Sequence, residues 1–443
     1  METIVENVWT KSKLLAKALI IGGIVLVLQI PAIYIRDLIE ERENRQKEAI
    51  TEVSSKWAGK QTITGPIFVL PYWENTGGIT KTKQYASFLP DNLVINSEVN
   101  PQEKYRGIYK VMLYHSSISM NGAFQNIQPE KLQIDSAYII WNEASLQIHL
   151  SDVRGLNEEM KINWKGQQLP LTVKYQEDSL EEESLITSIP MKGIEDLQNL
   201  NFSTSISLNG SDQLLFTPTG RSTTVHVNSG WPHPSFTGNT LPQNTQVKDS
   251  GFTATWKSMA HKRNFPQQWK NNAFNIYKST APSQYQNRNL AAASFGTNLY
   301  IPVNGYQKTM RSVKYAALCL LLTFASFFLI ETSNKRAVHP FQYGLVGLAL
   351  ILFYTLLLSF SEYIGFNISY AIASVLTIGL IAWFLKGLLG SGRLTMIFAS
   401  LMVLMYTYIF TILQLQDYSL LLGSIGLFLT LAVVMHFSKK FQW

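Results

Sequence analysis

The stretch HPFQYGLVGLALILFYTLLLSFSEYIGF, residues 339–366, is apolar over most of its length and contains one carboxylate, Glu362, near its far end. The hydrocarbon core of a bilayer is about 30 Å thick, and roughly 20 apolar residues of helix cross it. The stretch therefore predicts a membrane-spanning helix that carries an acidic side chain at one membrane boundary.

Five other segments meet or approach the same length and apolarity. The chain has 443 residues, of which 46% are hydrophobic and only 15% charged, and the apolar excess is concentrated in these segments. The first segment has no small-residue cleavage site after it, so we interpret it as an uncleaved signal anchor. The six predicted spans lie at about residues 14–35, 313–331, 341–360, 366–386, 394–413 and 418–437.

The positive charges of the short connecting segments predict the orientation of the spans, because Lys and Arg near helix ends resist translocation. The two remaining short loops, SEYIGF and QLQDYS, contain neither Lys nor Arg. We therefore expect both termini in the cytoplasm and residues of about 36–312 in the periplasm. The positive residues assigned to the cytoplasmic side are Lys11, Lys13, Lys17, Lys335, Arg336, Lys386, Arg393, Lys439 and Lys440.

The exported part of the chain has the pattern of a β protein. Segments such as YRGIYKVMLYHSSISMNGAF (residues 105–124) alternate polar and apolar residues and are bounded by turn formers, which predicts an antiparallel sandwich or a pair of sheets. The fold class is thus a polytopic α-helical membrane protein with a large extracytoplasmic, mainly-β domain. We divide it into a cytoplasmic tail and signal anchor (1–35), a helical stalk (36–64), a periplasmic β domain (65–312) and a C-terminal five-helix bundle with a short tail (313–443).

A search for catalytic and ligand-binding motifs is negative. The sequence has no HExxH, CxxC, GxSxG, GxxxxGK[ST] or GxGxxG pattern, and its single cysteine, Cys319, lies in a predicted span. The formal charge of +7 follows mainly from membrane topology, so it does not indicate nucleic-acid binding. We predict no enzyme, metal or cofactor; a convergence of Asp152, Asp212 and one histidine in a deep pocket would reverse that prediction.

The segment SGWPHPSFTGNTLP, residues 229–242, is unusually rich in proline and aromatic residues. Proline removes backbone donors, so this segment is not expected to be a central strand. Two interpretations remain open: a segment that covers the core, or a contact surface for another envelope component. The residues assigned to this possible contact are Trp231, Pro232, His233, Pro234 and Phe236.

Four motifs resemble those of a known family: GWPHPSFTGNTLP, VNGYQKTMRSVKYAALCLLLTFASFFLIE, the opening stretch, and DYSLLLGS. The sequence resembles the inner-membrane protein CreD family, the envelope-integrity or colicin-tolerance proteins of Gram-negative bacteria. The resemblance implies a role in envelope integrity that is linked in some bacteria to a two-component stress system. The family often has His after the Ser-Glu pair, where this chain has Tyr363. Its membrane motif corresponds here to His339, Pro340, Gln342 and Tyr343.

Charged residues gather at the predicted ends of the spans, where ionisable groups are usually paired or functional. We expect Glu362 to pair with Arg311 or Lys314 at the outer boundary; the alternative is an acid that faces lipid headgroups. The cytoplasmic boundary collects Glu331 with Lys335, Arg336 and His339. The predicted charge ties of the bundle are Arg311, Lys314, Glu331, Glu362 and Asp417.

Three classes of function are compatible with this organisation. The first is an envelope-integrity or stress factor whose periplasmic domain engages an envelope component while the bundle anchors it or relays a signal. The others are a transporter or lipid-handling protein, and a sensor read by a cytoplasmic partner. The expected partners are the lipid bilayer and an envelope protein or lipid. The sequence leaves the oligomeric state open.

Overall fold

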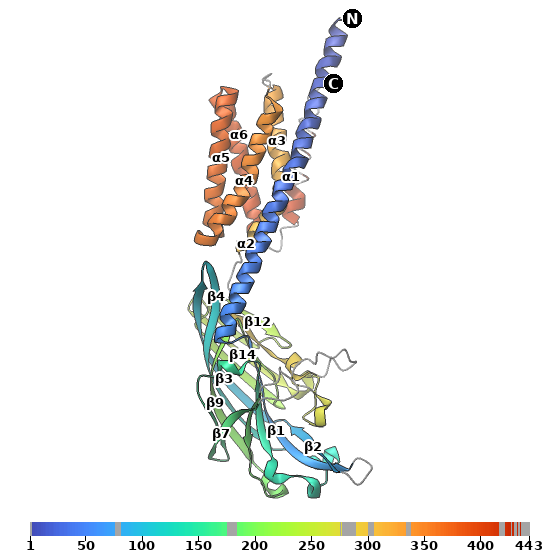
Figure 1. Cartoon of the computed structure of the whole chain (residues 1–443), viewed down its shortest axis with the longest axis vertical. Coiled ribbons are helices and arrows are strands. Elements are labelled where there is room, and N and C mark those ends of the chain that lie inside the picture. Colours follow the sequence, from blue (N-terminus) through green and yellow to red (C-terminus); the bar gives the residue numbers. More distant parts are fainter. Residues whose placement is uncertain are drawn as a thin grey trace. The chain divides into compact units, whose positions relative to one another are not determined.

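The computed structural model describes residues 2–75, 81–174, 184–274, 276, 289–299, 305–333, 338–415, 421–426, 428, 432 and 435. The chain forms two compact units, a helical unit (Met1–Lys47 with Val303–Trp443) and a β unit (Glu48–Pro302), drawn in Figure 1.

The first helix, α1 (Glu2–Trp57), contributes residues to both units. The intervals between its buried apolar residues are alternately four and three residues. This seven-residue repeat keeps one side of a helix, here called the seam, against its neighbours. The seam consists of Ile21, Val25, Leu28, Ala32, Ile35 and Ile39.

The end of α1 corrects the predicted extent of the stalk. The helix stops at Trp57 and strand β1 (Gln61–Asn75) follows, so residues 61–64 belong to the sheet. Their sequence, QTIT, is β-favouring, and Gly59 precedes it. The Gly65-Pro66 pair lies inside β1 at a register shift between Thr64 and Ile67, where an irregular strand tolerates proline.

The C-terminal part of the helical unit is built from apolar helices. These are α2 (Gly305–Lys314), α3 (Ala316–Ser333), α4 (Pro340–Ile364), α5 (Phe366–Leu389) and α6 (Gly392–Gln414). Within the described ranges, four helices including α1 are long and apolar enough to span a membrane, or five if α2 and α3, which meet at 45°, form one span. Of the sixth predicted span, only residues 421–426, 428, 432 and 435 are described, all as helix.

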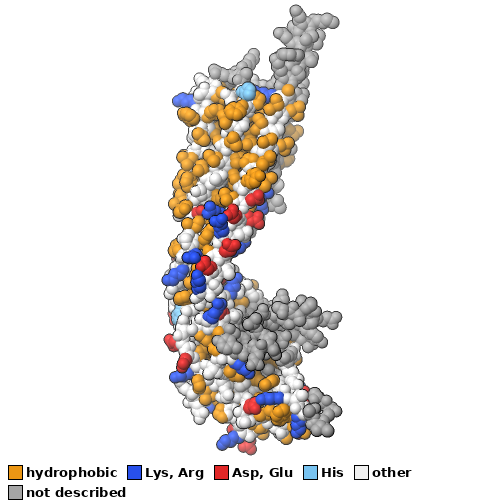
Figure 2. Space-filling model, in the orientation of Figure 1, with side chains coloured by type: hydrophobic (Ala, Val, Ile, Leu, Met, Phe, Trp, Pro, Cys, Tyr) orange, Lys and Arg blue, Asp and Glu red, His pale blue; other side chains and the backbone are white. Residues whose placement is uncertain are grey.

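The surface of the helical unit is as apolar as its interior. Large hydrophobic side chains such as Leu26, Val375 and Trp383 are more than two-thirds exposed. In Figure 2, hydrophobic side chains cover most of the face of this unit that is in view. Such a surface is matched to hydrocarbon rather than to water.

Within its described residues, the β unit forms one continuous sheet of 16 strands. Its main path runs β12-β16-β10-β1-β5-β8-β7-β6-β9-β4-β3-β11-β14-β13, and β2 joins β1 to β15. The strands after β1 are β2 (Lys81–Phe88), β3 (Asn92–Arg106), β4 (Tyr109–Phe124), β5 (Ser145–Leu150), β6 (Met160–Trp164), β7 (Gln167–Lys174), β8 (Ser184–Ser188), β9 (Leu200–Ser211), β10 (Gln213–Phe216), β11 (Ser222–Ser229), β12 (Pro234–Gly238), β13 (Asn244–Lys248), β14 (Gly251–Met259), β15 (Gln268–Lys270) and β16 (Phe295–Leu299).

Most neighbouring strands are antiparallel, as predicted, but two pairs are parallel. Strand β1 pairs in parallel with β10, and β3 pairs in parallel with β11. Alternating hydrophobicity identifies a strand and its buried face, but it carries no information about the strand's partner or direction. The predicted sandwich-like arrangement is therefore antiparallel except at these two pairs.

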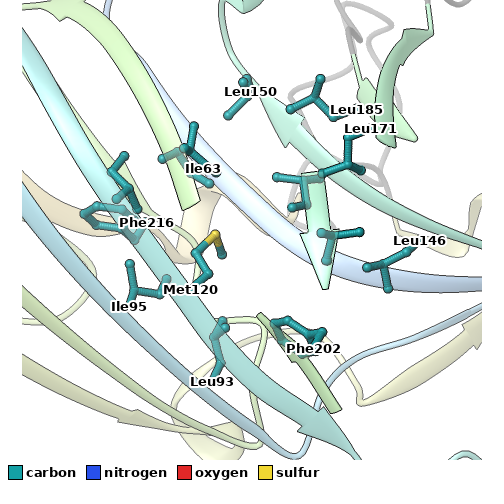
Figure 3. Packing of buried hydrophobic residues seen from close by; sticks show 14 of the residues in the cluster. Ile63, Leu93, Ile95, Met120, Leu146, Leu150, Leu171, Leu185, Phe202 and Phe216 are labelled. Atoms are coloured by element: carbon teal, nitrogen blue, oxygen red, sulfur yellow. The ribbon is translucent and has the colours of Figure 1, made fainter. Parts of the chain in front are cut away.

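The sheet packs against itself around one large apolar core. Figure 3 shows Ile63 of β1 and Leu146 of β5 in the same cluster as Leu93 of β3, Met120 of β4 and Phe202 of β9. The mainly-β sandwich-like core predicted from the sequence is therefore present.

Candidate functional site

Polar side chains form two regular rows on the outer face of the second half of the sheet. The alternation of β3 leaves Asn96 and Glu98 exposed while Ile95 and Val99 enter the core. Strand pairing then places polar residues of five other strands beside them, since residues in register share a face. One row is Asn244, Thr255, His226, Asn96, Ser119 and Ser205, and the other is Gln246, Thr253, Asn228, Glu98, Ser117 and Ser207.

This polar face is hollowed, and the hollow has a volume of about 1030 Å³. The side chains that line it carry hydroxyl, amide and imidazole groups, with no Trp, Tyr or Phe among them. Its charged residues are Glu98, Glu158, Glu159 and Lys161, so carboxylates outnumber ammonium groups. The arrangement offers many hydrogen-bonding groups, and the apolar residues Ile118, Met160, Ile206, Val227 and Ala254 lie among them.

A small network holds His115, one of the side chains that line the hollow, against Asn157 and Asn209, which lie outside the lining. Asn157 and Asn209 exchange hydrogen bonds at 2.6 and 3.1 Å, and His115 Nδ1 lies 3.1 Å from both side chains. Further along, His226 Nδ1 lies 3.0 Å from the Thr255 hydroxyl. These contacts hold the two imidazoles in place on a sheet that is itself rigid. We did not predict this face, because its rows combine strands distant in the sequence.

The segment around Trp231 closes the core. The Trp231 side chain is buried and its indole N–H donates to the His233 carbonyl at 3.0 Å. Phe236 packs edge-on against Phe252 and Trp256 of β14, at 5.7 and 5.6 Å between ring centroids. Strand β12 and β14 lie near opposite ends of the sheet path, so these aromatic contacts join the two ends.

The structure therefore favours the core-covering interpretation of this segment over the contact surface. The prediction that it is not a central strand is confirmed, because β12 is the terminal strand of the path. Trp231 and Phe236 are engaged within the domain. Pro232 and Pro234 are partly buried, and only His233 of the five predicted contact residues is exposed.

Asp152, one of the acids considered for catalysis, is held in structural contacts. Asp152 accepts from the Gly59 amide at 2.8 Å and from Arg154, whose guanidinium also donates to the Ser55 carbonyl near the end of α1. Burial alone would raise the pKa of Asp152, but these hydrogen bonds hold it below its usual value. Within the described residues, no group of three or more His, Cys, Asp and Glu side chains is placed to hold a metal.

In the helical unit, Glu331 of α3 is the centre of a buried polar cluster. Its carboxylate forms an ion pair with Lys17 of α1 and accepts from the Tyr343 hydroxyl at 2.7 Å and the Val338 amide at 2.9 Å. The Lys17 ammonium also donates to the Val338 carbonyl at 2.6 Å. Three elements, α1, α3 and the start of α4, thus meet at one carboxylate.

The motif residues at the start of α4 have clear local roles. His339 is the N-cap: its imidazole accepts from the Phe341 amide, and the Gln342 side chain accepts from the His339 amide at 3.0 Å. Pro340 occupies the first turn, where its missing N–H costs nothing. This start fixes the position of Tyr343, which is fully buried and reaches Glu331. The sequence motif groups these residues but gives no sign of Lys17, whose position in the sequence indicates only membrane topology.

Glu362 has partners other than the predicted ones. It accepts from the Tyr306 hydroxyl at 2.9 Å, and the Arg42 guanidinium of α1 lies at 3.9 Å. Within the described residues it forms no pair with Arg311 or Lys314. The reason is the rotation of α2, which turns Tyr306 toward α4; Arg311 lies five residues later, on another side of that helix. Asp417, the remaining predicted charge tie, lies outside the described residues.

A bundle of apolar helices joined to a large mainly-β unit defines a multi-pass membrane protein with a substantial domain outside the bilayer. The family model for inner membrane protein CreD matches residues 13–443. Inner membrane protein CreD of Escherichia coli (strain K12) is 30% identical over 441 residues, covering 98% of this chain and 94% of that protein. The chain therefore belongs to the inner membrane protein CreD family, and it is a multi-pass protein of the inner membrane. The resemblance found in the motifs is confirmed.

Proposed function

We propose that this chain is an envelope-integrity factor whose β unit lies in the periplasm and binds an envelope component at the polar face. The helical unit anchors the chain in the inner membrane. The predicted orientation supports this placement, because Lys and Arg gather in the segments assigned to the cytoplasm. Membership of an inner membrane protein family agrees with it.

The hollow on the polar face is the observation that carries the proposal. The rows of this face present mainly short Ser, Thr, Asn and His side chains in register across six strands, with Gln246 and Glu98 as the longer members. Short side chains lose little conformational entropy when a partner orders them. A ligand with many hydroxyl or amide groups fits such a lining.

We propose a binding role rather than a catalytic one. Asp91, like Asp152, is committed to structure: it accepts from the Gln125 and Asn126 amides at 2.7 and 3.0 Å and from Arg221 at 2.9 Å. Burial alone would raise the pKa of Asp91, but these hydrogen bonds hold it below its usual value. A carboxylate held in this way is a poor general base at neutral pH.

Photo-crosslinking in living cells tests the proposal. Probes at Ser117 and Thr253 face the hollow and are exposed, and a probe at Thr82 is exposed on β2 in the other half of the sheet. We expect the Ser117 and Thr253 probes to capture the same envelope component and the Thr82 probe not to capture it. Equal capture at all three positions, or capture only at Thr82, would refute the polar face as the binding site.

A further inference from the structure

The amphipathic helix α2 carries three cations on one side. Lys308, Arg311 and Lys314 are spaced three residues apart, which places them within one arc of the helix. The opposite arc is buried and contains Tyr306 and Thr309. Arg311 and Lys314 therefore lie on the less buried side of α2, whereas Lys308 contacts α6.

Polar contacts between α2 and the ends of neighbouring helices show where α2 lies along the length of the helical unit. Lys308 donates to the Gln414 side chain at the end of α6, at 3.1 Å, and Gln414 donates to Asn367 at the start of α5, at 2.6 Å. Glu362 near the end of α4 meets Tyr306 at the same place. The apolar stretches of α4 and α6 finish at these contacts and that of α5 begins there, so α2 lies at a membrane boundary.

The charge on α2 is not balanced by the described residues around it. The nearby carboxylate, Glu362, is bound by Tyr306 and lies beside Arg42. No carboxylate in the described ranges pairs with Arg311, which is half-buried, or with Lys314, which is exposed. Two cations at a membrane boundary that have no carboxylate partner among the described residues attract the negative charge of lipid headgroups.

The surface that continues from these cations is apolar. Leu321 of α3 lies seven residues, about two helical turns, after Lys314, and its side chain is 54% exposed. Beyond the 45° bend that separates α2 from α3, Leu321 therefore offers apolar surface to an acyl chain close in sequence to the cations. We propose that Arg311 and Lys314 bind the headgroup phosphate of an anionic phospholipid whose acyl chain lies along α3.

The test uses the full-length protein in nanodiscs with a phosphatidylglycerol analogue that carries a diazirine early in its acyl chain. Labelled residues are mapped by peptide mass spectrometry. We expect labelling near Leu321 to exceed labelling near Val375, an exposed apolar residue of α5 that serves as an internal reference. The Arg311→Gln/Lys314→Gln variant should lower this ratio by about fivefold for each lost cation.

Three comparisons make the test specific. The Arg311→Lys/Lys314→Arg variant keeps both charges and should keep the ratio, while Lys386→Gln/Arg393→Gln removes two exposed cations elsewhere and should also leave it unchanged. Unlabelled phosphatidylglycerol should compete, whereas inorganic phosphate should not. The proposal is overturned if the charge-removing variant keeps the ratio, if a phosphatidylcholine analogue labels Leu321 equally, or if inorganic phosphate competes equally well.

Discussion

The ion pair between Lys17 and Glu331 shows how one residue can organise several elements. Glu331 is only 6% exposed, and its carboxylate receives an ammonium, a phenol and a backbone amide. A buried charge is tolerated only where such partners compensate its lost hydration. The pair therefore contributes more to the register of α1 against α3 and α4 than to net stability.

Removing one partner of this pair should be more damaging than removing both. We expect Lys17→Met to lower the unfolding free energy of the helical unit by about 3 kcal/mol, because it leaves a buried carboxylate without its cation. The Lys17→Met/Glu331→Gln variant should lose less than the two single changes combined. Thermal unfolding in detergent measures the cycle; strictly additive losses would show that the two groups are not coupled.

His149 in β5 should make the β unit sensitive to acid. Burial lowers its pKa to about 4, and its Nδ1 has no hydrogen-bond partner among the described residues. The pKa of an unfolded histidine is about 6.5, so between these values only the unfolded chain takes up the proton. Stability should thus fall as the pH drops through this window, by about 3 kcal/mol in total.

Tryptophan fluorescence of the full-length protein, heated at several pH values, measures this dependence. The His149→Leu variant should show a shallower fall of the unfolding temperature between pH values of about 6.5 and 4. An unchanged slope would assign the acid sensitivity to other groups.

At the scale of elements, the packing of α1 depends on a glycine of α4. A Cβ at Gly347 would lie 2.2 Å from Leu28 Cδ1 and 2.9 Å from Phe324 Cζ, whereas a Cβ at Gly344 would meet nothing within 4 Å. The two glycines belong to the same apolar stretch, GLVGLAL, but only one is a contact point. The small residue lets two helices approach closely within one chain.

These glycines provide a matched pair of variants. Gly347→Val should destabilise the helical unit by about 1–3 kcal/mol through overpacking, and Gly344→Val should cost clearly less. Adding Leu28→Ala to Gly347→Val should restore part of the loss, because it removes the side chain that the new methyl groups meet. Unfolding in detergent reports all three; equal effects at both glycines would contradict the assigned contact.

The elements themselves were largely predictable, and their partners were not. The apolar run of α4 and the alternation of β3 follow from residue order alone. Tertiary packing decides the rotation of α2, which places Tyr306 rather than Arg311 beside Glu362. It also decides that Arg42 of α1 is the cation near this carboxylate. The parallel pairing of β3 with β11 and the polar face that it creates depend on contacts between strands with many residues between them.

At the scale of the whole molecule, the orientation in the membrane can be tested with a nearly cysteine-free chain. The only cysteine, Cys319, is 2% exposed, so it should react slowly with maleimides. We expect a membrane-impermeant maleimide to label Ser235→Cys in intact spheroplasts and to label Lys386→Cys only after permeabilisation, because the first position is predicted to be periplasmic and the second cytoplasmic. The reverse pattern would invert the proposed topology.

The order of strands in the sheet affects how this protein folds during its synthesis. Strand β1 needs β10 beside it, β10 needs β16, and β3 needs β11, so strands from both ends of the domain's sequence must meet before the core closes. Such a high contact order makes folding slow and leaves unpaired edges exposed while the chain is synthesised from its N-terminus. Soon after β16 is complete, α2 and the apolar α3 follow. We therefore expect the nascent domain to depend on chaperones until its last strand, β16, has been synthesised and exported.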